Sequence, residues 1–142
     1  MTAPARGYAE RMPEDTADAE QPEFRNVALT DALQTQDLAA VAFALRHGPT
    51  VVPLIPPGGE DPLDAGVWTY RDPSAGEITL LLFSDAAYKP STLPSGVALN
   101  SPGWLRAFLG LYEDEIATVL FDIAGPHAMR ATPTDLIAAL DA

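Results

Sequence analysis

The sequence contains no cysteine. This absence excludes disulfides, thiol catalysis and cysteine-bound zinc or iron–sulfur sites, and it fits a reducing compartment. Residues 1–15 lack the basic start and the long apolar stretch of a secretory signal peptide. The longest apolar runs also fall well short of the roughly 18 residues that a membrane-spanning helix needs. We therefore expect a cytoplasmic protein without a membrane span.

Basic residues are scarce as well. The 142 residues include 8 Lys and Arg against 20 Asp and Glu, which gives a formal net charge of −12. Lys89 is the only lysine, and no two basic residues are adjacent. A field of this sign repels nucleic-acid phosphates and anionic lipids. The charge argues against nucleic-acid and membrane-surface roles, and it leaves a protein partner or a second copy of the chain as the expected partner.

Glycine-rich phosphate loops are missing too. Neither G-x-G-x-x-G nor G-x-x-x-x-G-K occurs, and Gly58-Gly59 is followed at once by Glu60 and Asp61, whose charges repel a phosphate. No cofactor is expected.

Residues 1–23 differ in composition from the rest of the chain. They contain six acidic and two basic residues, and after Met1 the only sizeable apolar side chains are those of Tyr8 and Met12. Such a segment cannot bury enough apolar surface to offset the entropy of ordering it. We interpret it as a disordered acidic tail, with an acidic interaction arm as the alternative, and we assign residues 24–142 to one domain.

Helical patterns and capping residues recur through residues 24–142. Asn26 precedes a short helix that carries Leu29 and Leu33. A break near Thr35 allows this residue to cap a second helix, which ends at Gly48. Two later helices begin at Ser101-Pro102 and Thr132-Pro133. The predicted strands, of which the second and third form a hairpin, are 50–55, 67–71, 77–83, 97–99, 116–123 and a brief one at 129. This order predicts an α+β fold, a mixed β-sheet containing a hairpin and packed by about four helices.

The strand at 50–55 is the candidate partner-binding edge. Its sequence, TVVPLI, contains Pro53, which favours an edge strand because proline cannot donate to a neighbour. Val51, Val52 and Leu54 would then accept a strand from a partner. The alternative is that the helices of the domain cover these side chains.

The order of these elements resembles the N-terminal domain of the enhanced-serine-sensitivity (SseB) proteins. The resemblance rests on N-x-x-L-x-x-x-L from Asn26, on the strand T-V-V-P-L from Thr50, on F-S-D from Phe83, and on the strand, glycine turn and T-P-x-x-L that close the chain. Asp122-Ile123-Ala124-Gly125 stands where that family has an Asn-Pro-Gly turn. The resemblance implies a small intracellular accessory or interaction domain and transfers no catalytic residue.

Catalytic and metal-binding constellations are weak. Ser101, His127 and Asp122 supply the residue types of a hydrolase triad, but no G-x-S-x-G elbow exists and Ser101 is better explained as a helix cap. The acidic run 113–115 places neighbouring carboxylates in different directions, so it does not form a cation cage. His47 suits a helix C-terminus better than a metal. No catalytic, cofactor-binding or metal-ligating residue is predicted.

The functional hypothesis is a non-catalytic accessory or protein-interaction domain. The alternative is a small-ligand sensor with an aromatic-lined pocket between sheet and helices, for which the candidate side chains are Trp68, Tyr70, Trp104 and Tyr112. A hydrolase that uses His127 is a third, weaker hypothesis.

Overall fold

The computed structural model of the chain describes residues 24–94 and 96–142, so the predicted tail, 1–23, lies outside the described residues. The helices within this part are α2 (Val27–Thr35), α3 (Leu38–Arg46), the short 3-10 helix η3 (Ala86–Tyr88), α4 (Pro102–Leu111) and α5 (Pro133–Asp141). The strands are β1 (Thr50–Pro53), β2 (Thr69–Arg71), β3 (Ile78–Leu82), β4 (Val97–Asn100), β5 (Ile116–Phe121) and β6 (Met129–Ala131). The predicted α+β class is confirmed, with four α-helices in the described residues.

Side-chain caps fix where the helices begin. Asn26, Ser101 and Thr132 accept hydrogen bonds from main-chain N–H groups of the first turns of α2, α4 and α5, as predicted, at 3.1, 3.2 and 3.0 Å. The predicted cap of the second helix is wrong. Asp37, not Thr35, caps α3 by accepting from the N–H of Ala39. Thr35 is not the cap because it still belongs to α2. The next residue, Gln36, has left-handed backbone angles and ends this helix, so the chain turns before α3 starts.

The strands form two sheets instead of the single mixed sheet expected. The larger has the order β2-β3-β5-β6, in which β2 and β3 form the predicted antiparallel hairpin and β3 and β5 run parallel. The smaller pairs β1 with β4. Val51 and Phe83 exchange two main-chain hydrogen bonds of 3.1 and 3.0 Å, and these connect the sheets.

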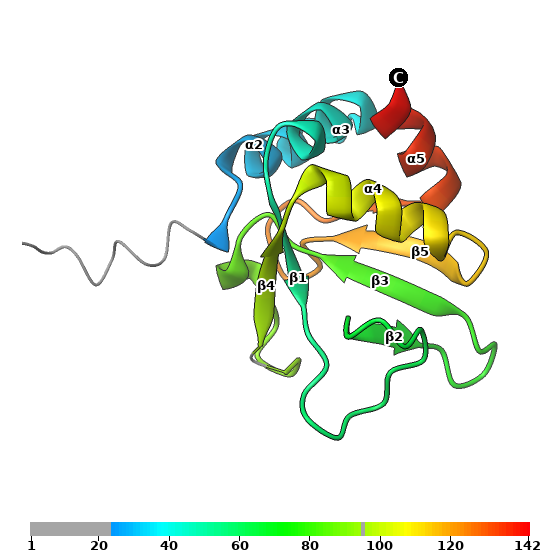
Figure 1. The fold of residues 1–142 in the computed structure, drawn as a ribbon. Helices are drawn as coiled ribbons and strands as arrows, with labels where there is room; N and C mark the ends of the chain where they lie inside the picture. Colours follow the sequence, from blue (N-terminus) through cyan, green and yellow to red (C-terminus); the bar gives the residue numbers. More distant parts are fainter. Residues whose placement is uncertain (1–23, 95) are drawn as a thin grey trace, which may run out of the picture.

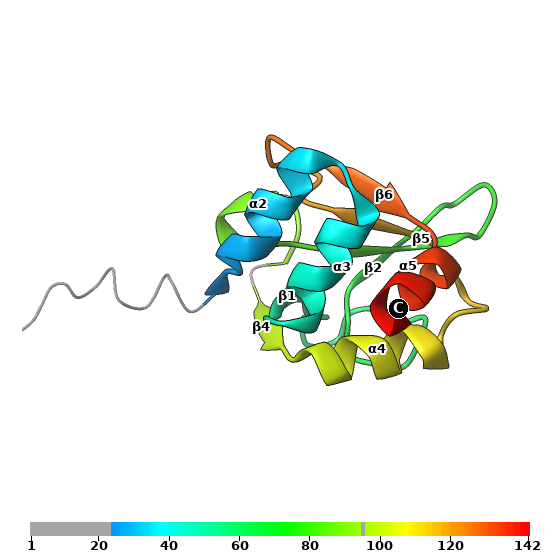
Figure 2. The same ribbon diagram turned by 90° about the horizontal axis from the view of Figure 1, so that it is seen from above.

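All four α-helices lie on one side of the strands (Figures 1 and 2). Their apolar side chains pack on alternate residues of β3 and β5, namely Leu80, Leu82, Val119 and Phe121, all of which are completely buried. The opposite side of the strands carries a second, smaller cluster around Val51, Leu81 and Phe83. Its partly buried members include Trp68, Tyr88, Val97 and Leu120.

The expected open edge at β1 is not found. Val51 and Val52 are both 0% exposed, because their side chains pack into the two apolar clusters. The main chain of β1 pairs with β4 on one side and with Phe83 on the other. Leu54 is partly exposed and forms an isolated bridge with Val67. The alternative interpretation, that the helices of the domain cover these side chains, agrees with the structure for Val52, whereas Val51 is buried in the cluster on the opposite side of the strands.

Candidate functional site

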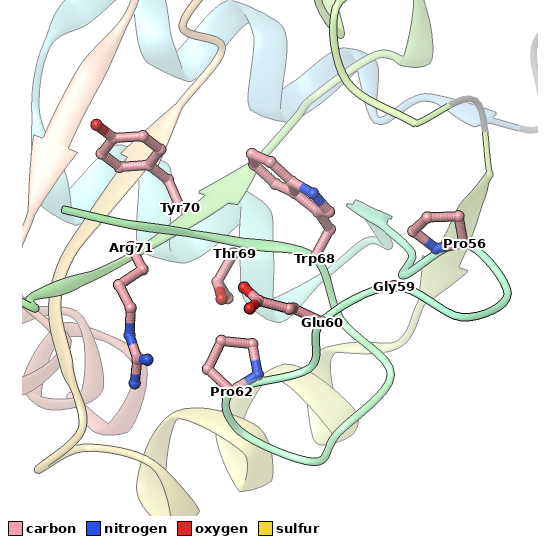
Figure 3. A pocket seen from close by; sticks show the side chains of 8 residues that line it. All are labelled: Pro56, Gly59, Glu60, Pro62, Trp68, Thr69, Tyr70 and Arg71. Carbon is pink, nitrogen blue, oxygen red and sulfur yellow. The ribbon is translucent and has the colours of Figure 1, made fainter. Parts of the chain in front are cut away.

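A hollow lies between the outer edge of β2 and the loop that precedes this strand (Figure 3). Its volume is about 240 Å³. The residues that line it are Pro56, Gly59, Glu60 and Pro62 from the loop, Trp68 just before the strand, and Thr69, Tyr70 and Arg71 from the strand. Two of the four aromatic residues named in the sequence, Trp68 and Tyr70, are therefore in this hollow.

Hydrogen bonds hold the loop wall of the hollow in place. The N–H of Gly59 donates to the carbonyl of Pro56 at 2.9 Å and closes the first turn. The carboxylate of Asp61 accepts from the N–H groups of Ala65 and Gly66, at 3.1 and 2.8 Å, and closes the second. With prolines at both ends of the lining segment, this wall is organised before any ligand arrives.

The strand wall presents main-chain polar groups. The N–H of Asp72 donates to the carbonyl of Glu77 at 2.8 Å, so these two residues form a hydrogen-bonded pair next to β2 and β3. This pair determines which residues of β2 direct their main-chain groups toward β3. Because hydrogen-bonded and non-hydrogen-bonded pairs alternate in an antiparallel ladder, Tyr70 directs its N–H and C=O toward β3. Thr69 and Arg71 direct theirs away from β3, and within residues 24–94 and 96–142 these groups have no main-chain partner. The outer side of β2 therefore has no main-chain partner in the described residues, with Arg71 exposed there and Thr69 only 8% exposed.

Polar side chains complete the hollow. Glu60 and Arg71 are exposed and carry opposite charges. The ion pair found among the described residues is Arg106 with Asp141 at 2.8 Å, so Glu60 and Arg71 do not neutralise each other. The hydroxyl oxygen of Thr69 is buried, and no described residue forms a hydrogen bond with it.

A second hollow, of about 280 Å³, lies along α4. It is lined by apolar groups that include Trp104, Phe108 and Tyr112, whose rings follow one another at centroid distances of 4.8 and 4.9 Å. Leu111 at its border is 71% exposed. The four candidate aromatic residues are thus divided between two surface hollows and do not gather in one pocket between sheet and helices.

The residues proposed for a hydrolase triad have other contacts. Ser101 caps α4, and both carboxylate oxygens of Asp122 accept hydrogen bonds from Ser84, one from its N–H and one from its hydroxyl. Asp122 is only 2% exposed, and burial raises the pKa of its carboxyl although the bonds from Ser84 act in the opposite direction. No hydrogen bond in the described part of the chain joins His127 to Ser101 or Asp122.

The acidic run and His47 take structural positions. Glu113 accepts a hydrogen bond from the hydroxyl of Thr134 at 2.8 Å, and His47 is the C-terminal cap of α3. No group of three metal-ligating side chains occurs in the described residues. None of the helices described is long and apolar enough to cross a bilayer.

The chain matches no protein-family model, no curated protein and no solved structure. The functional interpretation therefore depends on the residues themselves. The hollow beside β2 combines open main-chain groups, an aromatic ring and two free charges, and we take it as the candidate site.

Proposed function

We propose that this domain is a non-catalytic, cytoplasmic protein-interaction module of the SseB type, and that it binds an extended segment of a partner protein along the outer edge of β2. The observation that carries the proposal is the outward direction of the N–H and C=O groups of Thr69 and Arg71. An incoming strand pairs with such groups, and main-chain hydrogen bonds supply affinity while neighbouring hollows select side chains.

The size of the hollow favours a side chain of such a segment as its occupant. Small-molecule pockets usually measure about 300–1,000 Å³ and enclose most of their ligand. At about 240 Å³, the β2 hollow is smaller than this and has room for one side chain.

A small-ligand sensor is the second candidate function. It is favoured by the presence of Trp68 in the same hollow as the opposite charges of Glu60 and Arg71, which would suit a free zwitterion. Only a bound peptide would form hydrogen bonds with the main-chain groups of β2. A change to these groups therefore distinguishes a peptide-binding domain from a small-ligand sensor.

The test is a selection of random decapeptides, displayed on phage, on the 142-residue chain. Arg71→Pro deletes an outward N–H, while Arg71→Ala removes the same side chain and keeps that N–H. Proline is tolerated where the N–H of an edge strand faces outward, so both variants are expected to fold, and thermal melts check this.

We expect selected peptides to share a sequence and to bind Arg71→Ala at least tenfold more tightly than Arg71→Pro. Selection without a shared sequence, or equal binding to the two variants, would contradict strand addition at β2. Displacement of the peptides by millimolar free amino acid would favour the sensor.

A further inference from the structure

The two charged groups of the β2 hollow come from opposite walls. Glu60 belongs to the loop and Arg71 to the strand, and each is exposed. In Figure 3 the carboxylate of Glu60 points toward Thr69, while the ring of Trp68 lies on the other side of the strand. The guanidinium of Arg71 extends away from Trp68. The hollow therefore has an acidic end and a basic end.

The acidic end has the chemistry of a cation subsite. A carboxylate and a hydroxyl both accept hydrogen bonds from an ammonium or a guanidinium. Glu60 and Thr69 supply these two groups on the same side of β2 (Figure 3). No group at this end carries a positive charge except Arg71, whose guanidinium is directed elsewhere.

The hydroxyl of Thr69 is a second, independent indication. An unpartnered buried hydroxyl destabilises the folded chain, and a donor from a bound ligand would remove that destabilisation. Its oxygen is one of two buried side-chain oxygens without a partner in the described part of the chain, the other being in Thr50. Of these two threonines, only Thr69 lines the hollow.

The charge of the chain acts in the same direction. With 20 acidic and 8 basic residues, the chain attracts basic segments and repels acidic ones at long range. A basic side chain is therefore favoured over an acidic one for the first contact.

We infer that the hollow is the subsite for a lysine or arginine side chain of the partner segment, held by Glu60 and Thr69. In an extended segment, side chains two positions apart lie on one face about 6.6–7 Å apart. An acidic residue at that spacing meets Arg71, so the preferred segment reads basic-x-acidic. This inference rests on the proposed function, because it assumes that a strand is added to β2.

The test uses a fluorescently labelled decapeptide from the selection, measured against the full chain by fluorescence anisotropy. Its basic residue is replaced by norleucine, which keeps the aliphatic chain and removes the charge. Glu60→Gln removes the matching charge from the protein. Glu77→Gln makes the same change at an exposed position of the neighbouring hairpin and is the control.

We expect Glu60→Gln to weaken binding of the basic peptide at least tenfold and to leave binding of the norleucine peptide unchanged. Glu77→Gln leaves the affinity for both peptides unchanged. A shared sequence without a basic residue, or equal losses for both peptides on Glu60→Gln, overturns the cation subsite. If that happens while Arg71→Pro still binds at least tenfold more weakly than Arg71→Ala, strand addition stands and only the chemistry of the hollow is wrong. If Arg71→Pro and Arg71→Ala bind alike, both proposals are wrong.

Discussion

Ser84 donates two hydrogen bonds to the carboxylate of Asp122, from its N–H to Oδ1 at 2.7 Å and from its hydroxyl to Oδ2 at 2.6 Å. Ser84 lies two residues past the end of β3, and Asp122 directly follows the parallel strand β5. The hydroxyl of Ser84 also accepts from that of Thr30, and its carbonyl accepts from the N–H of Asn26. One buried network therefore joins the two central strands to the first turn of α2.

This network predicts a pH dependence of stability. Burial raises the folded-state pKa of Asp122 above its ordinary value, so the proton binds the folded chain more tightly than the unfolded one. The resulting stabilisation is fully present below the unfolded pKa of about 4 and is lost as the pH rises through the folded pKa. Asp122→Asn cannot titrate. Urea unfolding from pH 4 to 8 should show wild type gaining stability over Asp122→Asn as the pH falls, and parallel curves would show that Asp122 does not titrate abnormally.

The helix caps predict a loss of stability that depends on the substituted residue. Ser101→Ala and Thr132→Ala should each lower the free energy of unfolding by about 0.5–2 kcal/mol, because each removes the oxygen that accepts from the first turn. Ser101→Gly is the matched control and should cost only a few tenths of a kcal/mol. Denaturant unfolding measures all three, and an alanine variant as stable as wild type would show that the cap is not formed.

Burial of β1 predicts that a charge there prevents folding. Val52→Lys places an ammonium among completely buried groups without a counter-charge, and we expect loss of the cooperative thermal transition. Leu99→Lys makes the same change on the neighbouring strand β4, where the side chain is 37% exposed, and should leave the transition intact. A folded Val52→Lys protein would restore the open-edge interpretation of this strand.

Local signals in the sequence predict much of the fold. Polar residues ahead of apolar helical patterns located the starts of α2, α4 and α5, because a cap requires only neighbours in the chain. Thr35 was mistaken for a cap because the left-handed residue that ends α2, Gln36, carries no glycine signal. The predicted hairpin also agrees with the structure.

Long-range pairing explains the errors about the site. Pro53 is consistent with an edge, but the pairing of β1 with both β4 and Phe83 involves residues far away in the sequence. The hollow beside β2 was missed for the same reason, since Glu60 and Arg71 converge only when the loop folds back on Val67. A usable signal was present in the hairpin itself, because its first strand has one predicted neighbour and is therefore at an edge.

Hydrogen exchange of individual main-chain amides tests strand addition at β2 most directly. The measurement compares the exchange rates of the N–H groups of Thr69, Tyr70 and Arg71 by NMR, with and without a saturating selected decapeptide. Tyr70 already faces β3, while Thr69 and Arg71 face outward. We predict that the peptide slows exchange at Thr69 and Arg71 at least tenfold and leaves Tyr70 nearly unchanged. Binding of the peptide without slower exchange at Thr69 and Arg71 would contradict strand addition at β2.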